Sequence, residues 1–261
     1  MNRLRRACLR TTLITLLAAI AWTAAAADAP LVAAASDLRF ALDEIAAQFA
    51  RDTGTSVRIV YGSSGNFRRQ IAEGAPFELF MSADEAYVLA LAKEGCTVDD
   101  GVPYAIGRIA LVVPEGSSLR LDPRLQDLAV AAVDGRVRKF AIANPEHAPY
   151  GRTAQEALTA AGAWDAIRPR LVLGENVAQA AQFALSPSAQ GGIVALSLAL
   201  APDVLGSARY VAIPEAMHQP LRQRMALTKR AGSVARGFYE YLQQPAARAV
   251  FKRYGFALAG E

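Results

Sequence analysis

Residues 61–66 (YGSSGN) combine two serine hydroxyls and two glycines in front of a predicted helix. An alternating, β-branched strand is predicted over 57–60, and a helix with apolar positions four residues apart is predicted over 67–73. The first N–H groups of a helix have no partner and carry about half a positive charge, so this turn could bind an anion. The turn lacks a lysine and the Gly-x-x-x-x-Gly-Lys spacing, which excludes a nucleoside-triphosphate loop.

Ser36 stands in the same arrangement earlier in the chain. An apolar strand is predicted over 31–35, and the helix that follows has apolar residues at i, i+4, i+7 and i+11 from Leu38 and ends at Gly54. Ser36 and Ser64 are predicted to cap the two helices. Parallel strands that each end in such a helix direct both helix N-termini to the carboxyl edge of the sheet, where ligands of open α/β sheets bind. Ser36 and Ser64 are therefore predicted to form one half of an anion site.

The remaining patterns predict strands and helices in two series, which indicates an α/β fold with two lobes. The strand over 106–113 is long enough to pass between the lobes, and a strand over 224–228 is predicted to return. We therefore predict a first lobe of residues 28–108 plus 226–261 and a second lobe of residues 109–225. Further strands are predicted over 78–82, 140–143, 193–196 and 210–213, and further helices after Ser82, over 152–161, after Asn176, around Val234 and from Pro245.

Residues 1–27 have the three parts of a secretory signal peptide. Four arginines precede the apolar stretch 13–21, and the alanines at 25–27 match the small-residue pattern of a signal-peptidase site. We predict cleavage after Ala27 and a periplasmic location. The full chain has 28 basic and 24 acidic residues, and this segment removes four arginines and no acid. The mature chain is then neutral, which argues against nucleic acid as a partner, and its single cysteine, Cys96, cannot form an internal disulfide.

Short segments in a specific order along the whole mature chain carry a family resemblance. They are 33–36 (AAAS), 69–76 (RQIAEGAP), 80–84 (FMSAD), 144–151 (NPEHAPYG), 162–165 (GAWD), 174–177 (GENV), 192–194 (GIV), 214–215 (PE) and 251–256 (FKRYGF). In these segments the sequence resembles the periplasmic molybdate-binding proteins of ABC-type molybdate importers. The resemblance implies the type II periplasmic binding protein fold, in which two Rossmann-like lobes are joined by two crossings of the chain and hold a ligand in the cleft between them.

The resemblance also implies the ligand and its contacts. Molybdate and tungstate are dianions with four acceptor oxygens and no proton to donate, so a site built from neutral N–H and O–H donors suits them. By position, the family's contacts fall on Ser36, Ser64, Tyr150 and Val177, which would contact the oxygens of the oxyanion and not the metal directly. The implied partner is the membrane permease of an ABC importer. No cofactor and no enzymatic activity are expected, and the protein is expected to be a monomer.

Three features of the sequence differ from a simple anion site. Some family members place a tyrosine hydroxyl where Ala195 stands, and we hypothesise that the phenol of Tyr150 supplies this donor instead. Asp37 is unfavourable beside a dianion and is expected to point away from the cleft. Arg68 and Arg69 follow the turn on the next helix and are expected on its solvated face.

Other functions stay open on the residues alone. Sulfate is also an unprotonated tetrahedral dianion but is smaller, so the size of the cavity would decide between it and molybdate. Phosphate would require an acceptor for its proton, which an inward-facing Asp37 could provide. A serine hydrolase would use Ser64 as its nucleophile, but the chain has only two histidines, His147 and His218, and lacks the Gly-x-Ser-x-Gly pattern around Ser64. No His, Cys and Asp cluster in the sequence indicates a transition-metal cation site.

Overall fold

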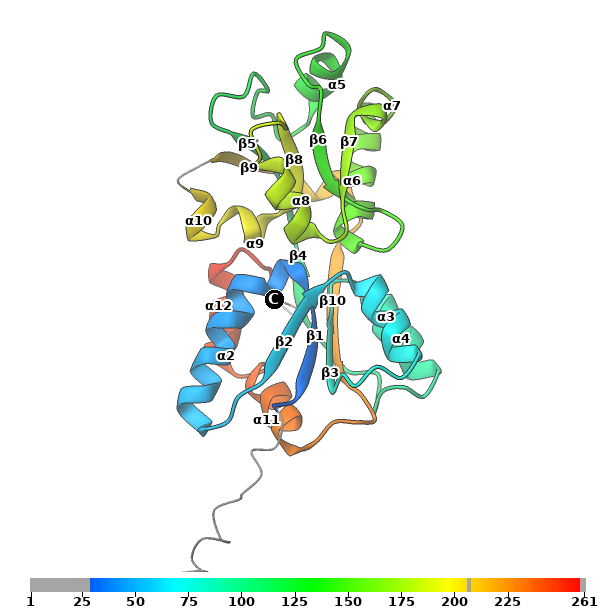
Figure 1. Ribbon diagram of the computed structural model, residues 1–261, viewed down its shortest axis with the longest axis vertical. Helices are drawn as coiled ribbons and strands as arrows, with labels where there is room; N and C mark the ends of the chain where they lie inside the picture. The colour runs from blue at the N-terminus through cyan, green and yellow to red at the C-terminus, as the bar shows by residue number, and fades with distance from the viewer. Residues whose placement is uncertain (1–28, 206–207, 259–261) are drawn as a thin grey trace, which may run out of the picture.

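The computed structural model describes residues 29–205 and 208–258, and the predicted signal peptide lies outside these residues. Figure 1 shows two lobes stacked along the long axis of the molecule, each built around one β-sheet with helices packed against it. The strand order is β2-β1-β3-β10-β4 in the sheet of the first lobe and β7-β6-β8-β5-β9 in the sheet of the second lobe. The predicted two-lobed α/β architecture is confirmed.

The elements of the two lobes have the following bounds. The first lobe contains β1 (Leu31–Ala35), η1 (Ser36–Leu38), α2 (Arg39–Thr53), β2 (Arg58–Gly62), α3 (Ser64–Ala72), β3 (Leu79–Ser82), α4 (Glu85–Lys93), β4 (Val102–Gly107), β10 (Leu221–Leu227), α11 (Ser233–Tyr241) and α12 (Pro245–Arg253). The second lobe contains β5 (Ile109–Pro114), α5 (Gln126–Val133), β6 (Phe140–Ala143), α6 (Pro149–Ala160), α7 (Trp164–Ile167), η2 (Arg168–Arg170), β7 (Leu171–Gly174), α8 (Val177–Ala184), β8 (Gly191–Ala195), α9 (Leu196–Ala199), α10 (Pro202–Leu205), β9 (Ala208–Ala212) and η3 (Glu215–Met217).

Strand β1 lies in the middle of the parallel part of the first sheet, which explains its uninterrupted apolar sequence. It pairs in parallel with β2 and β3, and helices cover both faces of the sheet. Val32 and Ala34 pack into the core beneath α2, α11 and α12, whereas Ala33 packs on the opposite face with residues of α3 and α4. Figure 1 shows these two helix layers on either side of the sheet. A strand that is buried on both faces needs an apolar residue at every position.

The second lobe repeats this arrangement around β6, every residue of which is buried. Strand β6 pairs in parallel with β7 and β8. Strand β5 then runs antiparallel between β8 and β9, as β10 runs antiparallel between β3 and β4 in the first lobe. Because the two sheets share this order, each lobe offers equivalent strand ends from which helices can start.

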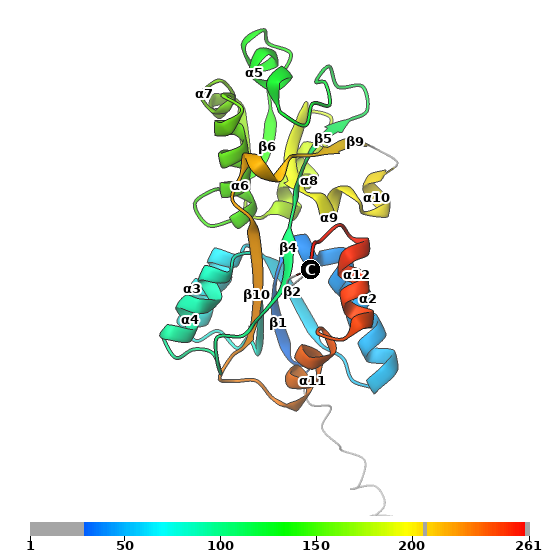
Figure 2. The ribbon, with the colours of Figure 1, turned by 180° about the vertical axis from the view of Figure 1, so that it is seen from behind.

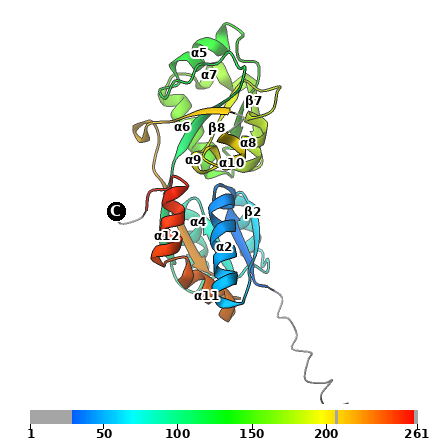
Figure 3. The same ribbon diagram turned by 90° about the vertical axis from the view of Figure 1, so that its left-hand side faces the viewer.

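The chain crosses between the lobes twice, between β4 and β5 and between β9 and β10 (Figure 2). The single strand predicted over 106–113 is wrong, because β4 ends at Gly107 in the first sheet and β5 begins at Ile109 in the second. The return is made before β10, all of which pairs in the first sheet, so the predicted lobe boundary at 225/226 falls inside this strand. Figure 3 shows from the side that α12 then lies beside α2 in the first lobe. Apolar periodicity cannot distinguish one long strand from two strands in different sheets.

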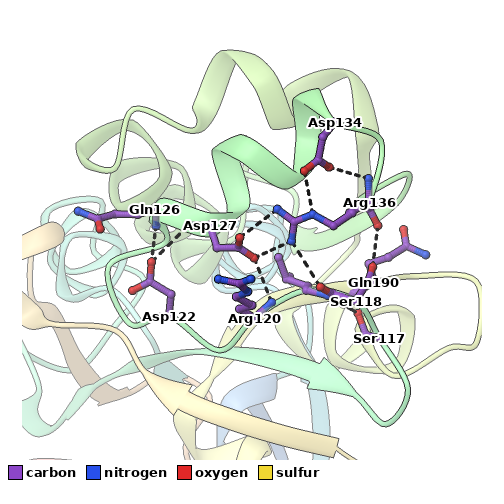
Figure 4. A network of polar contacts seen from close by, with 10 residues as sticks. Ser117, Ser118, Arg120, Asp122, Gln126, Asp127, Asp134, Arg136 and Gln190 are labelled. Atoms are coloured by element: carbon purple, nitrogen blue, oxygen red, sulfur yellow. Dashed lines mark hydrogen bonds and ion pairs between the residues drawn. The ribbon is translucent and has the colours of Figure 1, made fainter.

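The sequence patterns do not predict α5 or β7 in the second lobe. Helix α5 follows Leu125, which has a positive φ of 59°, and the Asp122 carboxylate accepts backbone N–H groups at its start. Arg136 binds Asp127 with both terminal nitrogens, at 2.9 and 3.0 Å, and Asp134 through Nε at 2.8 Å (Figure 4). Polar contacts thus hold this end of the lobe, and α5 packs on the core through Leu128, Ala131 and Ala132, whose helical spacing is present in the sequence.

Candidate functional site

A small cavity lies between the lobes, at the starts of the helices that follow β1, β2, β6 and β7. It contains about 190 Å³ of empty space. This figure includes space open to solvent, and the part open to the centre of a water-sized sphere is about 10 Å³, roughly one such sphere, so the cavity suits a small ion and not a drug-sized ligand. It brings together the four residues implied by the resemblance: Ser36 and Ser64 from the first lobe, and Tyr150 and Val177 from the second. The other lining residues are Ala35, Asp37, Gly62, Ser63 and Ala83 of the first lobe and Ala148, Pro149 and Asn176 of the second.

Each of these four residues lies at the first or second position of a helix. Ser36 begins η1, which continues directly into α2, and Ser64 begins α3. Tyr150 follows the first residue of α6, and Val177 begins α8. A backbone N–H at such a position has no acceptor within its own helix, and the helix dipole adds positive potential there. Four backbone donors from two lobes therefore line one small cavity.

The hydroxyls of Ser36 and Ser64 do not cap their own helices, so that prediction is wrong. Ser36 Oγ accepts the backbone N–H of Ala178, at 3.2 Å, from the opposite lobe. Ser64 Oγ accepts the backbone N–H of Ala83, at 3.0 Å, from the loop after β3. A hydroxyl that accepts one hydrogen bond still has its own proton to donate. Both side chains are therefore oriented by neighbouring N–H groups and keep a donor for a ligand.

Asn176 caps helix α8, as predicted, and leaves the backbone N–H of Val177 without a side-chain partner. Its side-chain oxygen accepts the N–H groups of Ala178 and Gln179, both at 3.1 Å. The N–H of Val177, which precedes them, lies at the cavity. The cap thus satisfies the inner N–H groups of the first turn and leaves the outermost one for an anion.

Asp37 is buried at the cavity, which corrects the expectation that it points away from the cleft. The residue is 1% exposed and forms part of the cavity lining. Its Oδ2 accepts the Tyr150 hydroxyl at 2.9 Å and the side-chain amide of Gln223 at 2.7 Å. Burial raises the pKa of Asp37 to about 6, although these two hydrogen bonds and the backbone N–H of Asp37 itself oppose the shift. Sequence reasoning missed this orientation because it depends on partners 113 and 186 residues away.

The phenol of Tyr150 is committed to Asp37. Burial, together with the neighbouring Asp37, raises the pKa of Tyr150 well above its ordinary value, so the hydroxyl keeps its proton. That single proton is donated to Asp37 Oδ2. The hypothesis that this hydroxyl replaces the donor absent at Ala195 is therefore not supported, and only the backbone N–H of Tyr150 is available to a ligand.

The two lobes touch each other beside the cavity. The carbonyl oxygen of His147 accepts the N–H of Gly65 at 3.0 Å and the Ser63 hydroxyl at 2.7 Å. Asn66 binds Glu175, and Arg152 forms an ion pair with Asp84. These contacts join α3 and the loop after β3 to the loops and helices of the second lobe. The cleft is thus closed by direct contacts, none of which was predicted from the sequence.

The geometry does not activate a serine nucleophile. Ser64, the nucleophile of the hydrolase alternative, is hydrogen-bonded to the N–H of Ala83 and not to a base. Ser63 lies 2.9 Å from Nδ1 of His147, but its proton goes to the His147 carbonyl oxygen. The ring nitrogen must then donate to Ser63, and a donor cannot act as a general base.

No lysine or arginine lines the cavity in the part of the chain that the structure describes, and Asp37 is its one carboxyl residue there. Arg68 pairs with Glu94, and Arg69 is exposed and binds Asn66, so both lie outside the cavity as expected. Within residues 29–205 and 208–258, no group of three or more His, Cys, Asp or Glu side chains could hold a metal ion. None of the helices in these residues is long and apolar enough to span a membrane.

The fold and the site define a class of two-lobed binding proteins, and the sequence matches the bacterial extracellular solute-binding protein family over residues 30–257. The chain belongs to this family, whose members are not enzymes. Its fold is that of the periplasmic binding proteins, as predicted.

Three comparisons place the chain within the class. The molybdate-binding protein ModA of Azotobacter vinelandii is 34% identical over 230 residues, which cover 87% of this chain and 89% of that protein. ModA of Rhodobacter capsulatus is 31% identical over 248 residues, or 94% of each chain. The solved periplasmic molybdate-binding protein of A. vinelandii superimposes with a TM-score of 0.80 at 31% identity, covering 88% of this chain and 99% of that one. Within the solute-binding class, the chain belongs to the ModA family of molybdate-binding proteins.

Proposed function

We propose that this protein captures molybdate, and also tungstate, in the cavity between its lobes and delivers the oxyanion to the permease of an ABC importer. The observation that carries the proposal is the convergence of neutral donors from four helix starts, two in each lobe, on one cavity of about 190 Å³. The relatives named above are molybdate-binding proteins, which supports this choice of oxyanion.

The donor set matches the chemistry of a fully deprotonated tetrahedral dianion. The backbone N–H groups of Ser36, Ser64, Tyr150 and Val177 and the hydroxyls of the two serines provide six neutral donors. Each hydrogen bond to a charged group contributes roughly 1.5–3 kcal/mol, so six contribute on the order of 10–20 kcal/mol before dehydration and closure are subtracted. A remainder of about 8–12 kcal/mol corresponds to dissociation constants from micromolar to nanomolar. No lysine or arginine is needed in the cavity to reach this range.

Binding is proposed to close the lobes. An anion that bridges Ser36 and Ser64 on one lobe and Tyr150 and Val177 on the other stabilises the closed arrangement more than an open one. The closed arrangement is also held by the His147 carbonyl, which binds Gly65. The two chain crossings, at residues 107–109 and 213–221, are the connections about which the lobes would move.

Delivery is proposed to occur outside the cytoplasm. A cleaved signal peptide over 1–27 would place the mature chain in the periplasm, where the loaded, closed form would dock as a monomer on the permease. Transport energy would come from an ATPase on another chain.

The test is a calorimetric and thermal-shift panel of molybdate, tungstate, sulfate and phosphate on the mature protein. We expect molybdate and tungstate to bind with micromolar or tighter affinity and to raise the unfolding temperature. Stabilisation by sulfate or phosphate without stabilisation by molybdate would contradict the assignment and identify the protein as a receptor for another tetrahedral oxyanion.

A further inference from the structure

One oxygen of the buried Asp37 carboxyl is fully used, and the identity of its donors is determined by the surrounding hydrogen bonds. The Tyr104 hydroxyl donates to Gln223 Oε1 at 2.7 Å. Gln223 therefore presents its Nε2 to Asp37 Oδ2 at 2.7 Å and to the Tyr150 hydroxyl oxygen at 3.2 Å. The Tyr150 hydroxyl, which accepts from Gln223, donates to the same Oδ2. Oδ2 thus accepts two hydrogen bonds, as the carbonyl oxygen of a carboxylic acid does.

The other oxygen of Asp37 has no such donor. Oδ1 is buried and has no hydrogen-bond partner among the described residues, and Asp37 lines the oxyanion cavity. A buried polar atom is normally hydrogen-bonded, and a buried charge without a partner is strongly disfavoured. A molybdate dianion in the cavity carries no proton that it could donate to Oδ1. A proton on Oδ1 itself resolves both problems, because it removes the charge and makes Oδ1 a donor.

We propose that Asp37 is a specificity-determining residue of the oxyanion site and contacts the bound dianion as a neutral carboxylic acid, with its Oδ1 hydroxyl donating to one oxyanion oxygen. This inference rests on the proposed function. It supplies the additional donor that Ala195 cannot provide. An ionised Asp37 must first take one proton from solvent, so that binding of one dianion consumes one proton and no other atom changes partner.

The groups around Asp37 support the neutral form. From β4 and α6 the phenols of Tyr104 and Tyr150 face it, and both are uncharged because burial raises the pKa of each well above its ordinary value. Gln223 approaches from β10, and the Ser197 hydroxyl of α9 donates to the Asp37 backbone carbonyl at 2.7 Å. Helices α8 and α9, which also contact η1, carry no titratable side chain. On α2, Arg39 and Asp43 are exposed.

Protonation of Asp37 makes capture depend on pH. Burial already raises the pKa of this carboxyl to about 6, and an adjacent dianion raises it further because like charges repel. Above pH 6 the free protein is mostly ionised at Asp37, so the affinity for molybdate falls close to tenfold for each pH unit. Below pH 6 the free protein already carries the proton on Asp37, so the affinity for molybdate no longer changes with pH.

The same proton discriminates between oxyanions. With Asp37 neutral, no carboxylate lines the cavity, and the hydroxyl of a hydrogen phosphate ion would find no charged acceptor for its proton. With Asp37 ionised, Oδ1 could accept that hydroxyl, as a carboxylate does. Phosphate is therefore disfavoured while Asp37 keeps its proton, and phosphate binding is expected only above about pH 6 and without proton uptake.

The experiment is calorimetry of the mature protein with sodium molybdate at pH 6.5, 7.5 and 8.5, each in two buffers of different ionisation enthalpy. The difference in apparent enthalpy between buffers reports the number of protons taken up. We expect uptake close to one proton per molybdate at pH 8.5 and an affinity that falls by close to tenfold for each pH unit between pH 7 and 8.5. Molybdate binding without proton uptake at pH 8.5 overturns this inference and leaves the proposed function intact, whereas no molybdate binding at any pH overturns both.

Asp37→Asn is the matched variant, because an asparagine keeps an acceptor for Tyr150 and Gln223 and presents N–H to the cavity at every pH. It should bind molybdate with no proton uptake and with the same affinity from pH 6.5 to 8.5, about tenfold or more tighter than the native chain at pH 8.5. A pH slope equal to that of the native chain contradicts the inference. If Asp37→Asn does not unfold cooperatively, Tyr150→Phe is used in its place. Removal of this donor to Oδ2 raises the pKa of Asp37, so the decrease in molybdate affinity should begin at a higher pH. A decrease that begins at the same pH as in the native chain also contradicts the inference.

Discussion

Closure of the lobes depends on the absence of a side chain at Gly65. This residue is the second of α3, and its N–H donates to the carbonyl oxygen of His147 in the other lobe at 3.0 Å. A Cβ atom at Gly65 would lie 2.5 Å from that oxygen and 3.1 Å from the Cα of His147. Both are backbone atoms that cannot rotate away. Gly65→Ala should therefore leave the first lobe folded and prevent full closure.

The size of the effect follows from the contacts that closure makes. An alanine at position 65 separates the backbones, so the hydrogen bonds from Gly65 and Ser63 to His147 are both lost or stretched. Each is worth roughly 0.5–1.5 kcal/mol, and the ligand bonds that bridge the lobes weaken as well. We expect a total loss of about 2–4 kcal/mol, which corresponds to roughly a 30- to 1,000-fold weaker affinity for molybdate.

The assay is calorimetric titration of molybdate, with thermal unfolding in the absence of the ligand as the test of folding. Gly237→Ala is the control, because Gly237 also lies in a helix, α11, and a Cβ there meets nothing within 4 Å. Alanine is favoured over glycine within a helix by about 0.5–1 kcal/mol, so Gly237→Ala should not unfold earlier than the native chain, and Gly65→Ala should still unfold cooperatively. Gly237→Ala should keep native affinity. An affinity of Gly65→Ala within threefold of native would refute the role of this contact in closure.

Three further outcomes are expected. Ser64→Ala removes a ligand donor and the acceptor of the Ala83 N–H, and should weaken molybdate binding by about 1.5–3 kcal/mol; native affinity in calorimetry would exclude the hydroxyl from the site. Asp37→Asn should be more stable than the native chain by about 3 kcal/mol above pH 6 and equally stable near pH 3. The reason is that the pKa of Asp37 is about 6 in the folded state and lower in the unfolded state, so the native chain loses stability as the pH rises from about 4 to 6. Denaturant titrations that show the same difference in unfolding free energy at every pH would disprove this. Arg136→Gln, in the network of α5 far from the cleft, should change neither affinity nor its pH slope, and an altered molybdate titration would show that the second lobe transmits strain to the site.

Much of the fold is determined by local patterns in the sequence. The strands at Leu31–Ala35 and Phe140–Ala143 match the predicted ranges because both are buried on two faces. A strand that is buried on both faces has an uninterrupted run of apolar residues, which is visible in the sequence. The same locality explains a failure. The crossing at Arg108 separates two strands whose apolar sequences run on as one.

At the site, local patterns placed Ser36, Ser64 and Asn176 at helix starts, because N-terminal turns have local signatures. They predicted that the next helix begins at residue 152, whereas α6 begins at Pro149, and only the family resemblance indicated Tyr150. The tertiary structure decided what their side chains do. Ser36 Oγ meets Ala178, 142 residues away, and Asp37 meets Gln223, 186 residues away, so neither partner leaves a trace in the neighbouring sequence. The size of the cavity and the burial of Asp37 likewise depend on how the two lobes meet. From the sequence, the carboxylate of Asp37 would repel a bound anion. In the folded protein, burial raises the pKa of this carboxyl and so favours its neutral form, because desolvation depends on the surrounding fold and not on the residue alone.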